Sequence, residues 1–278
     1  MSQSLTEKPT PTPAHAYQEY FGPAIFEPLL AKLLECAAPK SGDRVLDVAC
    51  GTGIVTRRVA ALAGPRGRVV GVDINPVMLE VARSIPSLGG APIEWRRGDG
   101  TALELPVGAF DLVYCQQGLQ FFPDRAAGVS EMRRVLAEGG RAVIATWQGI
   151  DRHPLYAALA EAEVPHLSAL GVEITRRELE APFSLGSADE LRSIFTDAGF
   201  EEARIVERSI DARFATPERF IERMEFAYAA VIPQFAEDLS AFEAYVEAVA
   251  RDTKEIVERY RDGEHIVVPM HANITVAS

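Results

Sequence analysis

Acidic residues and glycines in the first third of the chain are spaced to suit a nucleotide-type ligand. The apolar run from Val45 to Val48, interrupted by Asp47, is typical of a buried strand, and Gly51 and Gly53 follow it directly. Glycines at such a turn let the backbone bend tightly, and they let a ligand lie against bare main chain beside the N–H groups of the next helix. The run therefore predicts a ligand site between a strand and a helix.

A second carboxylate, Asp73, closes the next predicted strand, 20 residues after Gly53. At this place in nucleotide-binding folds a carboxylate accepts hydrogen bonds from ribose hydroxyls, so the ligand is expected to carry adenosine. The dinucleotide pattern G-x-G-x-x-G/A fits poorly because Thr56 takes its last position. In addition, none of the seven tyrosines is followed by a lysine four residues later, so a hydride-transfer enzyme would lack this proton donor.

The run from Asp47 to Gly53 resembles the first motif of the class I S-adenosylmethionine-dependent methyltransferases, D/E-x-G-x-G-x-G, with Ala49 at the first glycine. Further matches follow in the family's order and spacing, at residues 72–79, 98–106, 110–115 and 131–140. The resemblance covers about residues 40–150. It is nearest to the broad type 11 group, which includes the ubiquinone/menaquinone C-methyltransferases and other small-molecule methyltransferases.

The resemblance implies S-adenosylmethionine as the cofactor and gives each motif a role. Asp47 and the glycine turn are expected to hold the methionine end, Asp73 the ribose, and Ile74 and Met78 the adenine. A sulfonium ligand calls for hydrogen-bond acceptors and carboxylates, which this set supplies. The residues expected to bind the cofactor are Tyr20, Asp47, Ala49, Cys50, Gly51, Gly53, Asp73, Ile74, Met78, Asp99, Gly100, Thr101 and Gln116.

Aromatic side chains on either side of these motifs are candidates for the rest of the pocket. Tyr17, Tyr20 and Phe21 precede the first predicted helix, and in similar enzymes this segment folds over the donor; the alternative is that they only cap the sheet. Phe121 and Phe122 follow the fourth strand and are candidate walls for the methyl acceptor, with ordinary packing as the alternative.

A general base is optional for methyl transfer, because orienting the two reactants supplies most of what the protein must do. If the acceptor needs one, His153 is the candidate, since it lies just past the fifth strand and a histidine titrates near neutral pH. An exposed loop histidine is the alternative, and His271 on the last strand is a second candidate. No metal-binding cluster is visible in the sequence, so the protein is predicted to act without a metal.

Short apolar strands alternate with helices through residue 147, a pattern that predicts an α/β fold with a parallel sheet covered on both faces. The family resemblance makes this a Rossmann-like, seven-stranded, mostly parallel sheet whose last strand, residues 265–277, is antiparallel. A helical insertion, residues 216–261, falls between strands six and seven, and the resemblance implies a lid; a packing or dimerisation element is the alternative. Residues 1–14 are expected to be a disordered tail, and residues 15–215 with 262–278 the methyltransferase core.

The composition of the chain limits the kinds of partner that it is expected to bind. The net charge of −12 and the pI of about 5.0 leave no electrostatic footprint for nucleic acid. Three scattered cysteines, the absence of a signal-like N-terminus and the absence of a membrane-length apolar run favour a cytoplasmic protein without a membrane segment. The N/D-P-P-Y/F clamp of amino-group methyltransferases acting on adenine or glutamine is missing after the fourth strand, where Gln116 and Gln117 stand.

The sequence thus predicts a methyltransferase that moves a methyl group from S-adenosylmethionine to a small, largely apolar, natural-product or quinone-like acceptor. Three alternatives stay open: a donor-binding relative with different chemistry, a protein-directed methyltransferase, and a nicotinamide-linked oxidoreductase. The sequence does not determine the acceptor, the methylated atom or the oligomeric state, for which a homodimer is one possibility.

Overall fold

The computed structural model describes residues 12–228 and 239–278. Within them one twisted sheet runs in the order β3-β2-β1-β4-β5-β8-β6, and the two-residue strand β7 pairs with β8. The strands are β1 (Arg44–Val48), β2 (Arg68–Asp73), β3 (Ile93–Arg97), β4 (Phe110–Gln116), β5 (Leu136–Trp147), β6 (Ala203–Ala215), β7 (Arg261–Asp262) and β8 (His265–Ala277).

The strand directions confirm the predicted fold class. β1 pairs in parallel with β2 and β4, and β4 pairs in parallel with β5. β8 runs antiparallel to both β5 and β6, as predicted for the last strand, and it lies between them in the sheet. Because parallel strands buried on both faces need apolar side chains on both, the central strands β1, β2 and β4 are mostly apolar.

Helices cover both faces of the sheet. Their bounds are α1 (Pro13–Phe21), α2 (Glu27–Cys36), α3 (Ile54–Ala63), α4 (Pro76–Ser84), α5 (Arg125–Val135), α6 (Pro154–Ala169), α7 (Arg176–Leu179), α8 (Ala188–Asp197), α9 (Phe220–Tyr228) and α11 (Leu239–Glu258). Shorter helical turns are η1 (Gly22–Phe26), η2 (Leu119–Phe121), η3 (Ile150–Arg152), η4 (Ala181–Phe183) and η5 (Pro217–Arg219).

Alternate residues of the central strands enter two separate apolar clusters. Val45 and Tyr114 point into the cluster that α2 and α3 cover, whereas Leu46 and Val113 point into the cluster covered by α5 and α8. This alternation is the two-residue period of a strand. It fixes the register of the sheet, and therefore the place at which each strand ends beside the glycine turn.

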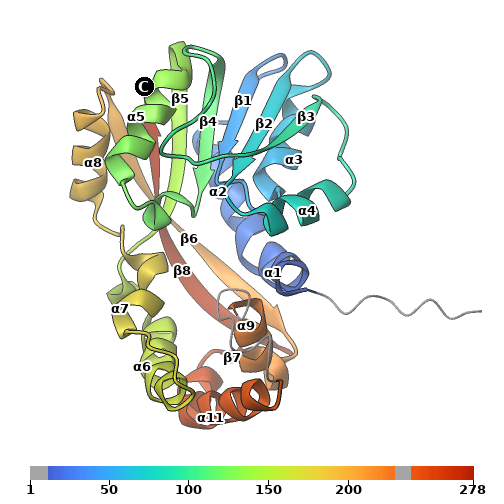
Figure 1. The fold of residues 1–278 in the computed structure, drawn as a ribbon, viewed down its shortest axis with the longest axis vertical. Helices are drawn as coiled ribbons and strands as arrows, with labels where there is room; N and C mark the ends of the chain where they lie inside the picture. The colour runs from blue at the N-terminus through green and yellow to red at the C-terminus, as the bar shows by residue number, and fades with distance from the viewer. Residues whose placement is uncertain (1–11, 229–238) are drawn as a thin grey trace, which may run out of the picture.

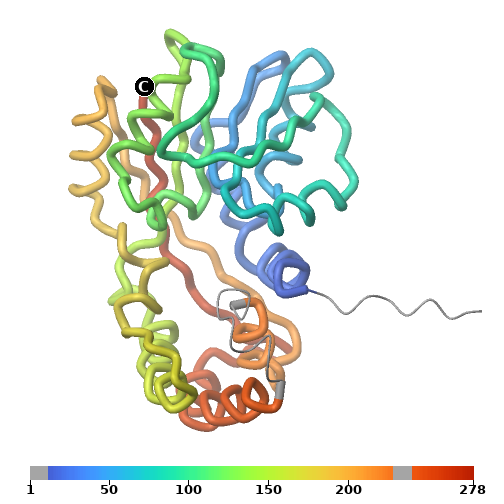
Figure 2. Tube along the Cα trace, in the orientation of Figure 1, coloured from blue at the N-terminus to red at the C-terminus, as the bar shows by residue number. Residues whose placement is uncertain are grey.

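A cap is built beyond the carboxyl ends of the central strands. β6 and β8 extend past the rest of the sheet and carry α9 and α11, as Figure 1 shows. In Figure 2 the tube after β5 also leaves the sheet and runs through α6 and α7 beside α11 before returning to α8. The packing of α11 on both α6 and α9 joins the two parts of the cap.

The cap therefore includes more of the chain than the insertion at residues 216–261, because α6 and α7 also belong to it. Both α7 and η4 lie within residues 171–186. That the insertion acts as a lid stays a prediction. The expected tail also ends earlier than residue 14, because Thr12 caps α1 and Ala14 is buried. Its residues 1–11 lie outside the described part of the chain.

One buried hydrogen bond ties the centre of the sheet to α2. The Tyr114 hydroxyl donates to the Ala37 carbonyl over 2.5 Å, at the residue where α2 ends. Tyr114→Phe is expected to lower the free energy of unfolding by about 1–2 kcal/mol, because a buried carbonyl loses its partner. Urea denaturation would measure the change. Tyr260→Phe, at a half-buried site in the cap, serves as the control, and an equal loss in the two variants would contradict this assignment.

Candidate functional site

The glycine turn after β1 is open on one side and packed on the other. Gly51 and Gly53 have φ angles of 53° and 82°, in the left-handed region that favours glycine. A Cβ atom at Gly51 would meet no atom within 4 Å, whereas one at Gly53 would lie 2.3 Å from the ring of Trp95 on β3. The main chain at Gly51 is therefore left bare for a ligand, while Trp95 supports the turn from behind.

Asp73 fastens this turn to the end of β2. Its Oδ2 accepts a hydrogen bond from the Gly51 N–H over 2.7 Å, and its Oδ1 accepts one from the Asn75 N–H over 2.8 Å. Burial raises the pKa of Asp73, and the two backbone bonds act in the opposite direction. The structure thus joins two features that the sequence places 22 residues apart.

Asp47 lies deeper in the site and has one oxygen without a partner. Its Oδ2 accepts a 2.5 Å hydrogen bond from the Thr56 hydroxyl, but its Oδ1 is buried and bonded to none of the described residues. Burial raises the pKa of Asp47 to about 7. An unpaired buried carboxylate is costly, so this position favours a cation or a proton as its partner.

Gln116, at the end of β4, presents a second free acceptor. Its Nε2 donates to the Phe26 carbonyl over 3.2 Å, which leaves its Oε1 buried without a partner among the described residues. Asp47 and Gln116 line one small crevice of about 40 Å³, the glycine-loop crevice. Its lining residues are Tyr17, Phe26, Asp47, Ala49, Cys50, Gly51, Thr52, Ile54, Val55 and Gln116.

The residues expected around the adenine lie at the open rim of the site. The Ile74 side chain is 64% exposed, Met78 is half-buried and Asp99 is exposed. Asp99 Oδ1 accepts from both the N–H and the hydroxyl of Thr101, over 2.8 and 2.7 Å, so this carboxylate also shapes its own turn. A Cβ at Gly100 would lie 2.4 Å from the ring of Phe122, which therefore packs here instead of lining an acceptor cavity.

Of the aromatic residues of α1, Tyr17 reaches the crevice and Tyr20 points elsewhere. The Tyr20 ring packs on Phe214 at 5.1 Å, and the Arg223 guanidinium lies 5.6 Å from its centre. The helical rotation of α1 turns Tyr20 toward β6 and α9, and Tyr20 does not line the crevice, so its contact with the cofactor stays a prediction. Tyr17 instead stacks on Phe26 at the crevice.

Two further cavities continue from the crevice into the cap. The aromatic cavity, about 80 Å³, is lined by Tyr17, Phe21, Ile25, Phe26, Gln117, Gln120, Phe121, Trp147, Tyr156, Pro182, Phe183 and Met270. The apolar cavity, about 410 Å³, is lined by Tyr17, Met78, Phe121, Tyr156, Leu159, Ala160, Glu163, Ile174, Glu178, Leu179, Ala181, Pro182, Phe183, Met224, Glu225, Ala227 and Tyr245. Tyr17 lines all three spaces, so they lie side by side, and the three together are called the track.

His153 stands behind the aromatic wall with both ring nitrogens engaged. Its Nδ1 donates to the Gly149 carbonyl over 3.1 Å, and its Nε2 accepts from the His271 N–H over 3.0 Å. Burial lowers its pKa to about 4, so it is neutral at physiological pH. This arrangement contradicts the expectation of a free general base at His153. The ring lies 4.7 Å from that of Phe183 and supports the cavity wall.

A pair of carboxyl groups, Glu225 buried and Glu163 half-buried, lines the apolar cavity. Glu163 of α6 is hydrogen-bonded to Glu225 of α9, and the Tyr245 hydroxyl of α11 donates to Glu225 over 2.9 Å. Burial raises the pKa of both carboxyls, and their mutual repulsion raises that of Glu225 further. The pair therefore holds a shared proton near neutral pH.

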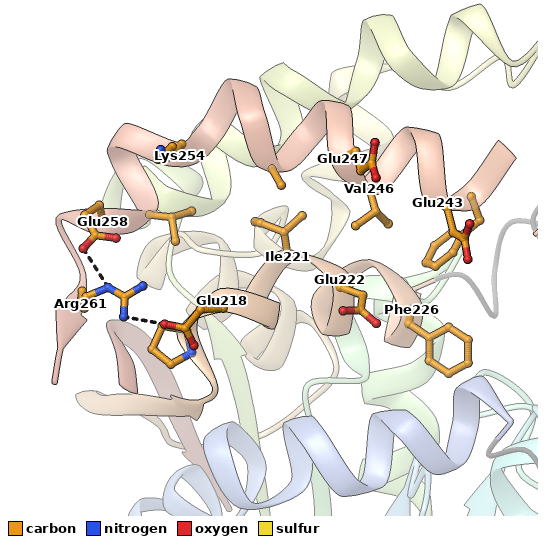
Figure 3. A pocket seen from close by; sticks show the side chains of 14 residues that line it. Glu218, Ile221, Glu222, Phe226, Glu243, Val246, Glu247, Lys254, Glu258 and Arg261 are labelled. Carbon is orange, nitrogen blue, oxygen red and sulfur yellow. Dashed lines mark hydrogen bonds and ion pairs between the residues drawn. The ribbon is translucent and has the colours of Figure 1, made fainter. Parts of the chain in front are cut away.

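A further cavity lies away from this track. It measures about 720 Å³ and opens between α9 and α11, where Figure 3 shows Ile221 and Val246 facing each other across it. At one end Arg261 bridges Glu218 and Glu258, with N–O distances of 3.0 and 2.8 Å. This cavity belongs to the cap and does not reach the glycine turn.

Within residues 12–228 and 239–278, no three acidic, histidine or cysteine side chains are grouped to hold a metal ion. No helix in those ranges combines the length and apolar character needed to cross a bilayer. Action without a metal stays a prediction.

Comparison with known proteins identifies the family. Residues 45–140 match the model of a methyltransferase domain. The chain is 32% identical over 176 residues to the ubiquinone/menaquinone biosynthesis C-methyltransferase UbiE of Pseudomonas syringae pv. tomato, covering 60% of this chain and 69% of that protein. It is 36% identical over 125 residues to the 2-phytyl-1,4-naphthoquinone methyltransferase of Synechococcus elongatus, covering 44% of this chain and 52% of that protein.

A solved structure agrees at the level of the fold. The phosphoethanolamine N-methyltransferase 2 of Haemonchus contortus, in complex with S-adenosyl-L-methionine, superposes with a TM-score of 0.55 at 20% identity, covering 95% of this chain and 56% of that one. The chain therefore belongs to the class I S-adenosylmethionine-dependent methyltransferases. The match to the naphthoquinone enzyme spans only about half of that protein, so the activity and the acceptor of the present chain are matters for proposal.

Asp47→Asn separates the two effects of the buried carboxylate. Because the pKa of Asp47, about 7, exceeds its usual 3.8, the ligand-free protein loses stability as the pH rises between these values. The variant is expected to be about 1–3 kcal/mol more stable at pH 8, yet to bind S-adenosylhomocysteine at least about tenfold more weakly, having lost a charge partner for the ligand's amino group. Thermal melts and calorimetric titration measure the two effects, with the exposed Asp189→Asn as control. Unchanged affinity would contradict the role.

Glu225→Gln tests the shared proton. The raised pKa values of the pair mean that the folded state loses stability as the pH rises above the usual value of 4.5, because the native pair resists ionisation. The wild-type melting temperature is therefore expected to fall between pH 6 and pH 8.5. Gln still accepts from Tyr245, so the variant is expected to melt at or above wild type at pH 8.5, with a flatter pH dependence. An identical pH profile would exclude the shared proton.

Proposed function

We propose that the protein transfers a methyl group from S-adenosylmethionine to a small, largely apolar acceptor held in the cavities beneath the cap. The observation that carries this proposal is the pair of unpartnered acceptors, Asp47 Oδ1 and Gln116 Oε1, in the same crevice as the bare main chain of Gly51. Two buried acceptors without partners suit a cationic ligand better than a pyrophosphate, which needs hydrogen-bond donors.

Each part of the site has a role toward the cofactor in this proposal. Asp47 and Gln116 would hold the amino-acid end, Asp73 the ribose, and the rim at Ile74, Met78 and Asp99 the adenine. When bound, S-adenosylmethionine supplies a methyl group on a positively charged sulfur. Each carboxylate oxygen of Asp73 accepts one hydrogen bond from a backbone N–H, and its second lone pair can accept a hydrogen bond from a ribose hydroxyl.

The acceptor side explains how the protein would position its second substrate. Tyr17 and Phe26 separate the glycine-loop crevice from the aromatic cavity, so a molecule in that cavity lies next to the cofactor end of the track. The apolar cavity beyond is walled mostly by aliphatic and aromatic side chains, which favours an apolar acceptor body. With His153 neutral and engaged, the protein acts by orienting the reactants and excluding water instead of supplying a free imidazole base.

The named relatives act on quinones, which are consistent with such an acceptor. Under this proposal the helical insertion at residues 216–261 is the lid over the acceptor. Two other hypotheses remain: a donor-binding protein with other chemistry, and a protein-directed methyltransferase. In neither case would the methyl label of the donor appear in a small molecule, as it would under this proposal.

Titration calorimetry with S-adenosylmethionine and S-adenosylhomocysteine tests the cofactor. Micromolar binding to wild type is expected, with a loss of about tenfold or more in Asp73→Ala, since that variant removes the ribose acceptor and releases the Gly51 turn. The exposed Asp189→Ala serves as the control. Binding of neither compound, or tight binding of a nicotinamide dinucleotide instead, would refute the proposal.

A further inference from the structure

Two buried glutamines follow β4 and face the aromatic cavity. Gln117 and Gln120 line it, with side chains 9% and 4% exposed. Gln117 has a φ angle of 58°, and its N–H donates to the Ala145 carbonyl over 2.8 Å. Arg125 donates to the Gln120 carbonyl and to the Ser184 hydroxyl, over 3.2 and 2.7 Å. The loop that carries both amides is thus fixed from two sides.

The two amides bond to each other and leave one group free on each. Gln120 Nε2 donates to Gln117 Oε1 over 2.8 Å. Gln117 Nε2 and Gln120 Oε1 are buried and have no partner among the described residues. Exchanging oxygen and nitrogen in both amides would keep the bond and again leave one donor and one acceptor. The cavity therefore presents a complementary pair whichever way the amides are assigned.

Buried polar groups without partners are rare in folded proteins, and they are costly unless a ligand satisfies them. None of the side chains that line the aromatic cavity is charged, so this cavity does not select a cationic head group. Phe121, Trp147, Tyr156 and Phe183 contribute ring surfaces to its walls. A flat, neutral group with its own donor and acceptor matches this lining.

The position of the Gln117 and Gln120 amides determines which end of a ligand they would bind. The aromatic cavity shares Tyr17 and Phe26 with the glycine-loop crevice, and it shares Tyr17, Phe121, Tyr156, Pro182 and Phe183 with the apolar cavity. Gln116, the neighbour of Gln117, faces the crevice. A molecule with its apolar body in the apolar cavity would thus present its polar end between the amide pair and the cofactor.

We propose that Gln117 and Gln120 determine the acceptor's identity by binding a planar ring that carries a hydroxyl group and a second oxygen on neighbouring atoms. The hydroxyl donates to Gln120 Oε1, and the second oxygen accepts from Gln117 Nε2. This assignment rests on the proposed function, because it takes the cavities as the acceptor site. It goes beyond that function by naming the oxygen pattern that the site selects.

The ligand series needs only the wild-type protein. In the presence of saturating S-adenosylhomocysteine, 2,3-dihydroxynaphthalene is expected to bind about 3- to 10-fold more tightly than 2-naphthol, because one further hydrogen bond forms. Titration calorimetry measures both affinities. Equal affinities, or binding of neither compound to a protein that binds S-adenosylhomocysteine, would overturn the inference and leave the proposed function standing. A protein that does not bind S-adenosylhomocysteine would overturn both.

Two variants place the preference on the amides. Gln117→Met and Gln120→Met keep an unbranched side chain of similar length and remove the polar end, so each is expected to reduce the preference below about twofold. S-adenosylhomocysteine affinity should stay within about twofold of wild type, because neither residue lines the glycine-loop crevice.

Gln148→Met is the matched control, since Gln148 is a buried glutamine that is bonded to Asn273 and lines neither acceptor cavity. It is expected to keep the full preference for 2,3-dihydroxynaphthalene. Folding of each variant is checked by its melting temperature, and the wild-type ligand series decides the matter if a variant fails to fold. A preference that survives in folded Gln117→Met and Gln120→Met would overturn the inference.

Discussion

The hydrogen bond from the Gly51 N–H to Asp73 is the contact on which the site depends. It fixes the glycine turn against the end of β2, while the parallel pairing of β1 with β2 and β4 fixes the strand ends on either side. Gly53 can approach Trp95 only because it has no side chain. With the turn held in this way, Asp47 and Gln116 line the same small space, and one oxygen of each has no hydrogen-bond donor among the described residues.

Polar groups are divided along the track by chemical type. The glycine-loop crevice offers acceptors, which suits the positive charge that a methyl donor brings. The aromatic cavity offers a neutral donor and acceptor, and two of the carboxyls that line the apolar cavity, Glu163 and Glu225, are hydrogen-bonded to each other. A molecule bound in the wrong orientation would leave some of these buried groups unpaired, so under the proposed function their order favours one orientation of the substrate.

The sequence was sufficient for those parts of the site that a local pattern encodes. Asp47, Gly51 and Asp73 each stand at a strand end or in a glycine turn, and the structure brings them together, while their roles toward a cofactor stay a prediction. Tyr17 and Tyr20 were both candidates, but choosing between them required the helical phase of α1. The tail predicted to end at residue 14 includes the first residues of this helix, so its phase was not predicted. Trp95 carries no local signal, because its role arises from the pairing of β3 with β2, which places it across the sheet from Gly53.

The surroundings of His153 and of the carboxyl pair could not be predicted from the sequence either, because they depend on tertiary packing. A histidine followed by a proline after a strand looks exposed in sequence, but β8 supplies an N–H donor from a residue 118 positions away and turns it into a buried structural group. Likewise, Glu163 belongs to a helix of weak amphipathic pattern, and nothing nearby in sequence marks it as buried beside Glu225.

The cap is therefore held together by a polar cluster as well as by apolar packing. Glu163, Glu225 and Tyr245 come from α6, α9 and α11, and they meet at the wall of the apolar cavity. α6 follows β5, whereas α9 and α11 are carried on the extended β6 and β8, so this cluster joins two separate excursions of the chain. Because a buried hydrogen-bonded carboxyl pair tolerates little displacement, it fixes the spacing of the three helices. Under the proposed function, the volume and shape available to an acceptor thus depend on a contact far from the glycine turn.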